Sequence, residues 1–170
     1  MKKAISTNGA PAAIGPYSQG YAFGDLVITS GQIPVDPATG TTPEGISAQA
    51  EQSCKNVGAV LAAGETGLGS VIKTTCFLAD MNDFAAFNEV YARYFINCPA
   101  RSCVAVKALP QNALCEIEAV RLPSGAPNYR FSGKTAEWVA AHHLTARLSL
   151  SHDGGMALAF CTLEQLPPET

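Results

Sequence analysis

The sequence has little charge and no long apolar run. Only 15% of its 170 residues are charged, the formal net charge is -3, and its lysines and arginines form no cluster. A surface that follows nucleic-acid phosphates needs such a cluster. Met1–Pro11 holds two lysines without the apolar segment of a secretory signal, and no apolar run reaches membrane-spanning length. We therefore expect a cytoplasmic protein without nucleic-acid or membrane partners.

Histidine is missing from most of the chain, and no two cysteines form a CxxC pair. The three histidines are His142, His143 and His152, so residues 1–121 contain no imidazole base. Triad-type and Cys-His mechanisms are therefore disfavoured, and acid–base work in that region falls to carboxylates, tyrosine or bound water. Adjacent His142 and His143 point to different helix faces, and we expect neither a metal site nor a cofactor. Most of the six cysteines are expected to be reduced and buried.

The pattern of the remaining chain predicts one α+β domain. Alternating or β-rich runs predict strands, and apolar residues at three- and four-residue spacing predict two long helices. Two helices of this length can cover one face of a mixed β-sheet and give a two-layer fold. The glycine-rich run at Gly64–Gly69 follows a helix and lacks the ending of a phosphate-binding loop, so it is interpreted as a helix stop. The expected strands are Lys3–Ser6, Tyr17–Phe23, Leu26–Ser30 and Val71–Leu78, and the helices are Ile46–Ala63 and Asp83–Phe95.

The segment Pro99–Arg121 combines one arginine with two glutamates on alternating runs. If Leu109–Asn112 closes a hairpin between these runs, Arg101 lies near Glu116 or Glu118. A guanidinium beside a carboxylate can anchor an acid substrate while the carboxylate polarises a water. From the residues alone, a cross-strand ion pair that helps to set the register is the favoured interpretation.

Five segments, in this order, resemble the RidA/YjgF-like imine deaminase family over residues 1–121. They are IGPYSQG (14–20), ITSGQIPVDPATG (28–40), FNEVYARYF (87–95), PARSCV (99–104) and EIEAV (116–120). The resemblance implies a chorismate-mutase-like fold, with a mixed β-sheet covered on one face by two helices. It also implies a homotrimer with its ligand sites at the subunit interfaces.

The same resemblance implies hydrolytic deamination of reactive enamine/imine intermediates, which are 2-imino acids, to 2-keto acids and ammonia. By this resemblance, Arg101 holds the substrate carboxylate and Glu116 positions the hydrolytic water. Glu118 is the second candidate for the role of Glu116. An imine is already electrophilic, so orientation and water activation suffice without a cofactor. For Cys103, which shares a strand face with Arg101, packing is favoured over a reactive thiol. The residues expected to shape the pocket are Tyr17, Ser30, Gly31, Asn88 and Cys103.

Each pocket residue also has a plainer interpretation without the resemblance. Tyr17 is then a half-buried aromatic residue, Gly31 a strand bulge and Asn88 a surface amide. A second class of function also stays open, namely a small-carboxylate-binding sensor or a chaperone-like trimeric module without catalysis. Arg101 serves an enzyme and a sensor alike, whereas Glu116 separates them, because a pure binder loses little when Glu116 becomes glutamine.

Residues 122–170 match nothing in the family, and we expect a C-terminal extension that is disordered or weakly structured. Its one helical candidate is Thr135–Leu148. A disordered appendage or a stretch created by a change of reading frame is favoured over a small added subdomain, because periodicity and caps are weak. A second departure is the Ile96–Cys98 connector, which is shorter than in family members and leaves the placement of Arg101 open.

Overall fold

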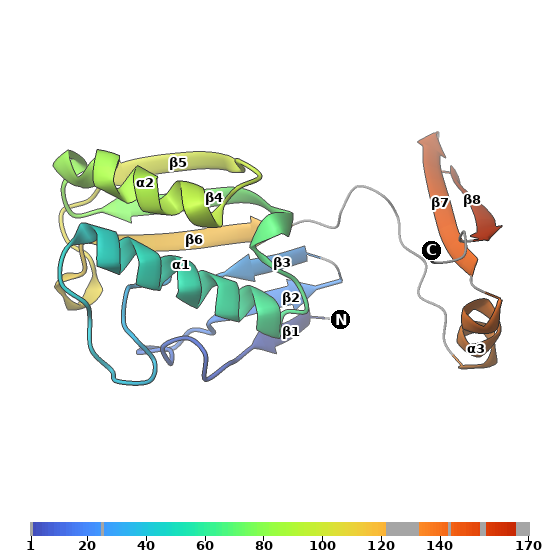
Figure 1. The fold of residues 1–170 in the computed structure, drawn as a ribbon, viewed down its shortest axis with the longest axis horizontal. Helices are drawn as coiled ribbons and strands as arrows, with labels where there is room; N and C mark the ends of the chain where they lie inside the picture. The colour runs from blue at the N-terminus through green and yellow to red at the C-terminus, as the bar shows by residue number, and fades with distance from the viewer. Residues whose placement is uncertain (1, 25, 122–132, 143, 154–155, 166–170) are drawn as a thin grey trace, which may run out of the picture. The chain divides into compact units, whose positions relative to one another are not determined.

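The computed structural model describes residues 2–24, 26–121, 133–142, 144–153 and 156–165. It forms two compact units, Met1–Leu122 and Pro123–Thr170. The first unit is a six-stranded mixed sheet in the order β1-β2-β3-β6-β4-β5. Figure 1 shows both long helices on one face of this sheet, so the predicted two-layer α+β fold is confirmed. Its elements are β1 (Lys2–Ile5), β2 (Gly20–Phe23), β3 (Leu26–Thr29), α1 (Ile46–Ala63), β4 (Val71–Leu78), α2 (Phe84–Tyr94), β5 (Ala100–Ala105) and β6 (Cys115–Arg121).

Helix α1 has the predicted bounds, and its apolar stripe forms the centre of the core. Gly45 is the residue before the helix, and its φ of 79° lies in the left-handed region that favours glycine. Gly64 follows the last helical residue, as the predicted helix stop requires. The side chains at three- and four-residue spacing pack against the sheet and α2, with no exposed surface at Ala50, Cys54, Val57 and Leu61.

The predicted hairpin between β5 and β6 is wrong, because β4 lies between these two strands. β5 pairs with β4 in parallel, and β6 pairs with β4 in antiparallel orientation. A parallel pair needs a crossover connection, and α2 supplies it between β4 and β5. The other edge of β4 then takes β6, which also pairs with β3 through Val27 and Ile28. The alternating pattern of the two runs was therefore interpreted correctly, but their pairing was not.

The connector between α2 and β5 is short and is tied to the rest of the unit. Cys98 adopts a φ of 49°, and its backbone N–H donates to Phe95 O at 3.0 Å. The Asn97 side chain donates to the carbonyl oxygen of Gly69. This turn brings Arg101 into register with Thr74 on β4.

The second unit contains α3 (Gly133–Ala141), β7 (Leu144–Asp153) and β8 (Met156–Gln165) among its described residues. The helix predicted over Thr135–Leu148 therefore ends at Ala141, and Leu144–Leu148 belong to β7, which pairs with β8 in antiparallel orientation. The Trp138 and His142 rings stack with their centroids 4.4 Å apart. His143 lies outside the described residues. Within the described residues, no helix combines the length and apolar character needed to cross a membrane.

Candidate functional site

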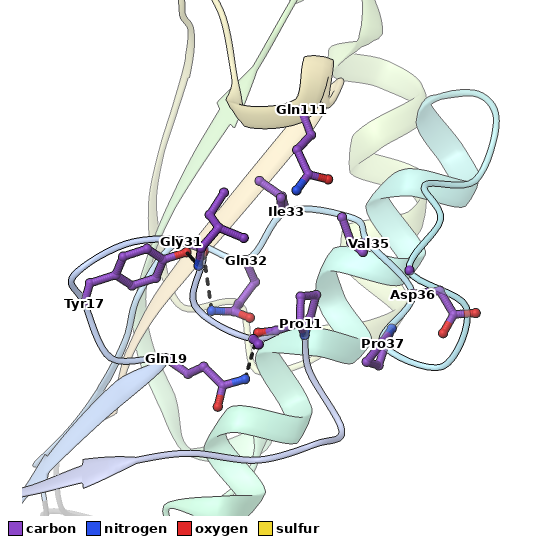
Figure 2. Close-up of a pocket in the computed structure, with 13 residues that line it drawn as sticks. Pro11, Tyr17, Gln19, Gly31, Gln32, Ile33, Val35, Asp36, Pro37 and Gln111 are labelled. Carbon is purple, nitrogen blue, oxygen red and sulfur yellow. Dashed lines mark hydrogen bonds between the residues drawn. The ribbon is translucent and has the colours of Figure 1, made fainter.

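A pocket of about 310 Å³ lies between two loops of the first unit and the turn before β6. Figure 2 shows Tyr17 at one side of the pocket, Asp36 and Pro37 at the other, and Gln111 at its top. Gly31 also lines the pocket. Its described lining is mainly apolar, with Asp36 as the one carboxylate and without lysine or arginine. Two of the predicted site residues, Tyr17 and Gly31, therefore share one concave surface.

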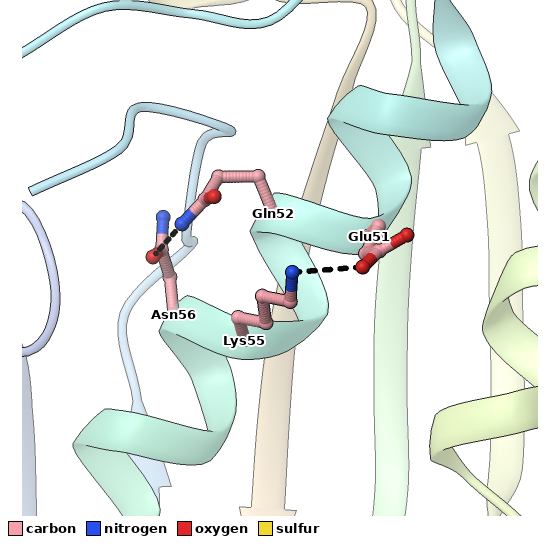
Figure 3. A network of polar contacts seen from close by, with 4 residues as sticks. All are labelled: Glu51, Gln52, Lys55 and Asn56. Carbon is pink, nitrogen blue, oxygen red and sulfur yellow. Dashed lines mark hydrogen bonds and ion pairs between the residues drawn. The ribbon is translucent and has the colours of Figure 1, made fainter. Parts of the chain in front are cut away.

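Buried amides hold both loops of this pocket in place. The Gln19 side chain donates to Thr7 O, Ala10 O and Pro11 O at 2.8–3.1 Å. On the other side, the Asn56 amide of α1 donates to Ile33 O and Val35 O, both at 2.9 Å. Figure 3 shows that Gln52, one turn earlier on α1, donates to Asn56 Oδ1. The pocket walls are thus fixed by side chains whose donors would otherwise be buried without partners.

Gly31 and Glu116 approach each other closely at the edge of this pocket. The backbone of Gln32 pairs with Ile117, which carries Gly31 to the neighbourhood of Glu116 on β6. A Cβ atom on Gly31 would overlap Glu116 Oε1. Ser30 joins this region through its hydroxyl, which donates to Ser18 O at 2.6 Å. We call Tyr17, Ser30, Gly31 and Glu116 the loop cluster.

The Glu116 carboxyl group is half-buried on the sheet face that the helices leave open. Burial raises the pKa of Glu116 above its ordinary value, and the nearby Glu118 carboxylate raises it further. Both effects disfavour the charged form. A raised pKa brings a carboxyl group closer to the range where a general base works best at neutral pH.

Arg101 lies on the opposite face of the sheet, beneath α2. Its guanidinium carbon is 4.6 Å from the centroid of the Tyr91 ring and 5.5 Å from that of Phe84. Asn88 is one turn from each of these aromatic residues on α2, and its buried Oδ1 has no hydrogen-bond partner among the described residues. Cys103 follows two residues after Arg101 on the same face of β5. We call Asn88, Arg101 and Cys103 the edge-strand cluster.

Cys103 packs against the core, and its surroundings disfavour the thiolate. Burial raises the pKa of its thiol, and the opposing effect of the Arg101 charge is smaller. A thiol becomes a good nucleophile only as the thiolate. The structure therefore favours the packing role predicted for this cysteine.

The two clusters do not meet within one chain. Arg101 pairs with Thr74 of β4, whereas Glu116 pairs with Phe77 of the same strand, and these two positions point to opposite faces. The predicted proximity of Arg101 to Glu116 or Glu118 is therefore wrong for a single copy. The physical reason is the insertion of β4 between β5 and β6. Among the described residues, no group of three His, Cys, Asp or Glu side chains could hold a metal ion.

Comparison with known proteins identifies the family. The sequence model described as endoribonuclease L-PSP matches residues 7–122. The chain belongs to this family. The predicted resemblance to RidA/YjgF proteins is thereby confirmed.

Similar family members include enzymes that act on imines. A 2-iminobutanoate/2-iminopropanoate deaminase of Salmonella typhimurium is 52% identical over 124 residues, which span 71% of this chain and 97% of that protein. The deaminase of the same name from Escherichia coli K12 is 50% identical over the same shares. The crystal structure of E. coli TdcF with bound serine is 48% identical, with a TM-score of 0.70, and the match covers 72% of this chain and 99% of TdcF.

Several residues that shape the candidate site were not predicted from the sequence. Gln19 lies in a segment predicted as a strand, and Asn56 lies in a predicted helix. An amide beside the buried stripe of a helix is a signal for a buried hydrogen bond, and Asn56 offered that signal. Tyr91 was part of the family-like segment FNEVYARYF, without a predicted role of its own. Its contact with Arg101 depends on the crossover that places β5 beside β4, which local pattern does not specify.

Proposed function

We propose that this protein catalyses the hydrolytic deamination of 2-imino acids to 2-keto acids and ammonia. The proposal is supported by family membership and by relatives of about half-identical sequence that are named 2-iminobutanoate/2-iminopropanoate deaminases. Serine bound to TdcF is a small amino acid, so that relative accepts a ligand with an α-carboxylate. An enamine substrate first tautomerises to its imine, whose C2 carbon is the electrophile.

In this mechanism the two clusters divide the work. Arg101 binds the substrate carboxylate through its planar fork of N–H donors. Glu116 accepts a proton from a water as that water attacks C2 and returns it to the imine nitrogen, which gives a neutral tetrahedral carbinolamine. Glu116 then transfers the carbinolamine hydroxyl proton to the amino nitrogen, the C–N bond breaks, and ammonia leaves as the C=O bond forms. The remaining pocket residues, Tyr17, Ser30, Gly31, Asn88 and Cys103, surround the substrate.

The second part of the proposal is a site shared between copies. It is supported by the separation of Arg101 from Glu116 within one chain. The protein assembles as a homotrimer in which the edge-strand cluster of one copy faces the loop cluster of its neighbour. The open sheet face supports this, since it exposes several large apolar side chains that a partner would bury. They are Tyr21, Phe23, Ile28 and Val104, which are 38–65% exposed.

Ammonia release and imine decay test the activity directly. The substrates are 2-imino acids generated in the assay by an amino-acid oxidase or a threonine dehydratase. We expect the wild type to accelerate both, and Glu116→Gln to lower kcat by about 10²- to 10⁴-fold. If the wild type gives no acceleration but binds small carboxylic acids through Arg101, the sensor function replaces the enzyme.

Mixing two inactive variants tests the shared site. Arg101→Ala and Glu116→Gln are unfolded together and refolded as mixed assemblies. In a cyclic trimer, about a quarter of the sites then combine an intact arginine with an intact glutamate, so about a quarter of wild-type activity returns. The same variants refolded separately are the control. A mixture that stays inactive while its assemblies are demonstrably mixed rules out a site shared between copies.

A cytoplasmic location stays a prediction from the sequence.

A further inference from the structure

The environment of Arg101 within the described part of the chain is aromatic. Among the described residues, no carboxylate pairs with Arg101 and no hydrogen bond from its guanidinium is present. Its contacts are the faces of the Tyr91 and Phe84 rings, at 4.6 and 5.5 Å from the ring centroids. A ring face attracts the cation without using its N–H donors, which point outward in the plane of the guanidinium. The donors therefore stay free for a bidentate ligand.

Tyr91 is held in place by a hydrogen bond and by ring stacking, in addition to its burial. Its hydroxyl shares a 2.7 Å hydrogen bond with the hydroxyl of Thr74, which has no exposed surface. Its ring stacks on Phe95 at a centroid distance of 4.4 Å and an interplanar angle of 19°. Burial raises the pKa of Tyr91 to about 12, so the phenol stays neutral at physiological pH.

Thr74 links the tyrosine to the strand that carries Arg101. Thr74 is the β4 residue in register with Arg101 on β5, so one backbone pair determines the position of both the arginine and the tyrosine hydroxyl. The ring thus lies at a set position relative to the backbone from which the guanidinium extends. An arginine side chain loses considerable rotamer entropy when a ligand fixes it, and a ring that orients it beforehand reduces that cost.

We infer that Tyr91, held by Thr74, is a positioning residue that orients the Arg101 guanidinium to bind the substrate carboxylate. The inference rests on the proposed function for Arg101 and adds a residue that acts through it. Tyr91 is not expected to touch the reacting atoms. Its loss should therefore weaken carboxylate binding and leave the chemical step largely intact.

The test compares Tyr91→Leu, Tyr91→Phe and Thr74→Val with the wild type in the imine assay and by calorimetric titration with pyruvate. We expect Tyr91→Leu to raise KM, and the dissociation constant for pyruvate, by about 3- to 30-fold, the range of a cation–π contact, with kcat changed less than twofold. Tyr91→Phe keeps the ring but loses its hydrogen bond to Thr74, and Thr74→Val loses the same bond from the other side. Both should therefore fall between Tyr91→Leu and the wild type.

Phe87→Leu is the matched control, because Phe87 is a buried aromatic residue of α2 that contacts Tyr91 but not Arg101. It reports what a general loosening of α2 does to KM. The inference is overturned if Phe87→Leu and Tyr91→Leu raise KM equally, or if Tyr91→Leu lowers kcat alone.

Arg101→Lys completes a double-mutant cycle. An ammonium lacks the planar face that stacks on the ring, so Tyr91→Leu should change pyruvate affinity much less in the lysine background. Equal effects in both backgrounds would contradict the inference. Arg101→Ala separates the two proposals. If it leaves pyruvate binding unchanged, the carboxylate role of Arg101 fails and the inference with it. If it abolishes binding while Tyr91→Leu has no effect, only the inference fails.

Discussion

At the scale of single residues, Gly31 leaves the space that the Glu116 carboxylate occupies. Any side chain at position 31 would overlap Glu116 Oε1 and displace the carboxylate. The sequence predicted both residues through the family segments, but their contact arises from the pairing of Gln32 with Ile117, a long-range feature. Local pattern offered only a strand bulge for this glycine.

Gly31→Ala should therefore displace the Glu116 carboxylate and lower kcat by about 10²-fold, because a small misplacement of a catalytic group is costly. The measurement is steady-state ammonia release. Gly67→Ala is the control, since a Cβ atom there meets nothing within 4 Å. Equal kcat values for the two variants would show that the position of Glu116 does not matter for catalysis.

The raised pKa of Glu116 makes stability depend on pH. A carboxyl group whose pKa is higher in the folded than in the unfolded state favours folding when protonated, and this contribution is lost as the pH rises through the folded-state pKa. Glu116→Gln should therefore have a higher melting temperature than the wild type at pH 7. The difference should shrink as the pH falls below about 4, near the unfolded pKa of glutamate. Thermal unfolding from pH 3 to 8 measures it, with the exposed Glu89→Gln as the control.

At the scale of elements, the local predictions succeeded where one segment determines its own structure. α1, β4 and α2 were predicted nearly to the residue, because each has a long apolar stripe or a β-rich run with clear breaks. The β5–β6 pairing could not be obtained in this way, since both strands alternate equally well in a hairpin or on either side of β4. Because of the predicted hairpin, Arg101 and Glu116 were expected to meet in one chain.

Asn56 joins α1 to the pocket loop, and its loss should destabilise the fold. Asn56→Ala leaves the Ile33 and Val35 carbonyl groups without their donor, at a cost of about 1–3 kcal/mol in the free energy of unfolding. Urea denaturation measures this loss. Lys55→Ala, at the next position toward the N-terminus, removes only an exposed ion pair with Glu51 and should change the value by at most about 0.5 kcal/mol. Similar losses for both variants would mean that the loop is held by other contacts.

At the scale of the whole molecule, the family match ends where the first unit ends. The family sequence model covers residues 7–122, and the first compact unit is Met1–Leu122. The disorder or weak structure expected for residues 122–170 stays a prediction, and their described part forms α3, β7 and β8. Neither strand was predicted from the sequence, and the first residues of β7, Leu144–Leu148, were interpreted as the end of a helix.

A version that ends at Leu122 should keep both assembly and activity, because it retains the whole six-stranded sheet and both clusters. Light scattering after size-exclusion chromatography measures the mass of the truncated and full-length proteins, and the imine assay compares their kcat values. We expect the same number of subunits and kcat values within about twofold. A monomeric truncated protein would assign the second unit a part in assembly.

The position of β6 has a consequence for how the chain folds during synthesis. β6 is made after every other strand of its sheet, yet it is inserted between β3 and β4. Until Arg121 has been translated, the strands already made can pair only as β1-β2-β3 and as β4-β5, each with an unpaired inner edge. Such edges pair readily with other chains, and closure depends on contacts that are distant in sequence. The strand that brings Glu116 into place is thus also the one that covers both unpaired edges.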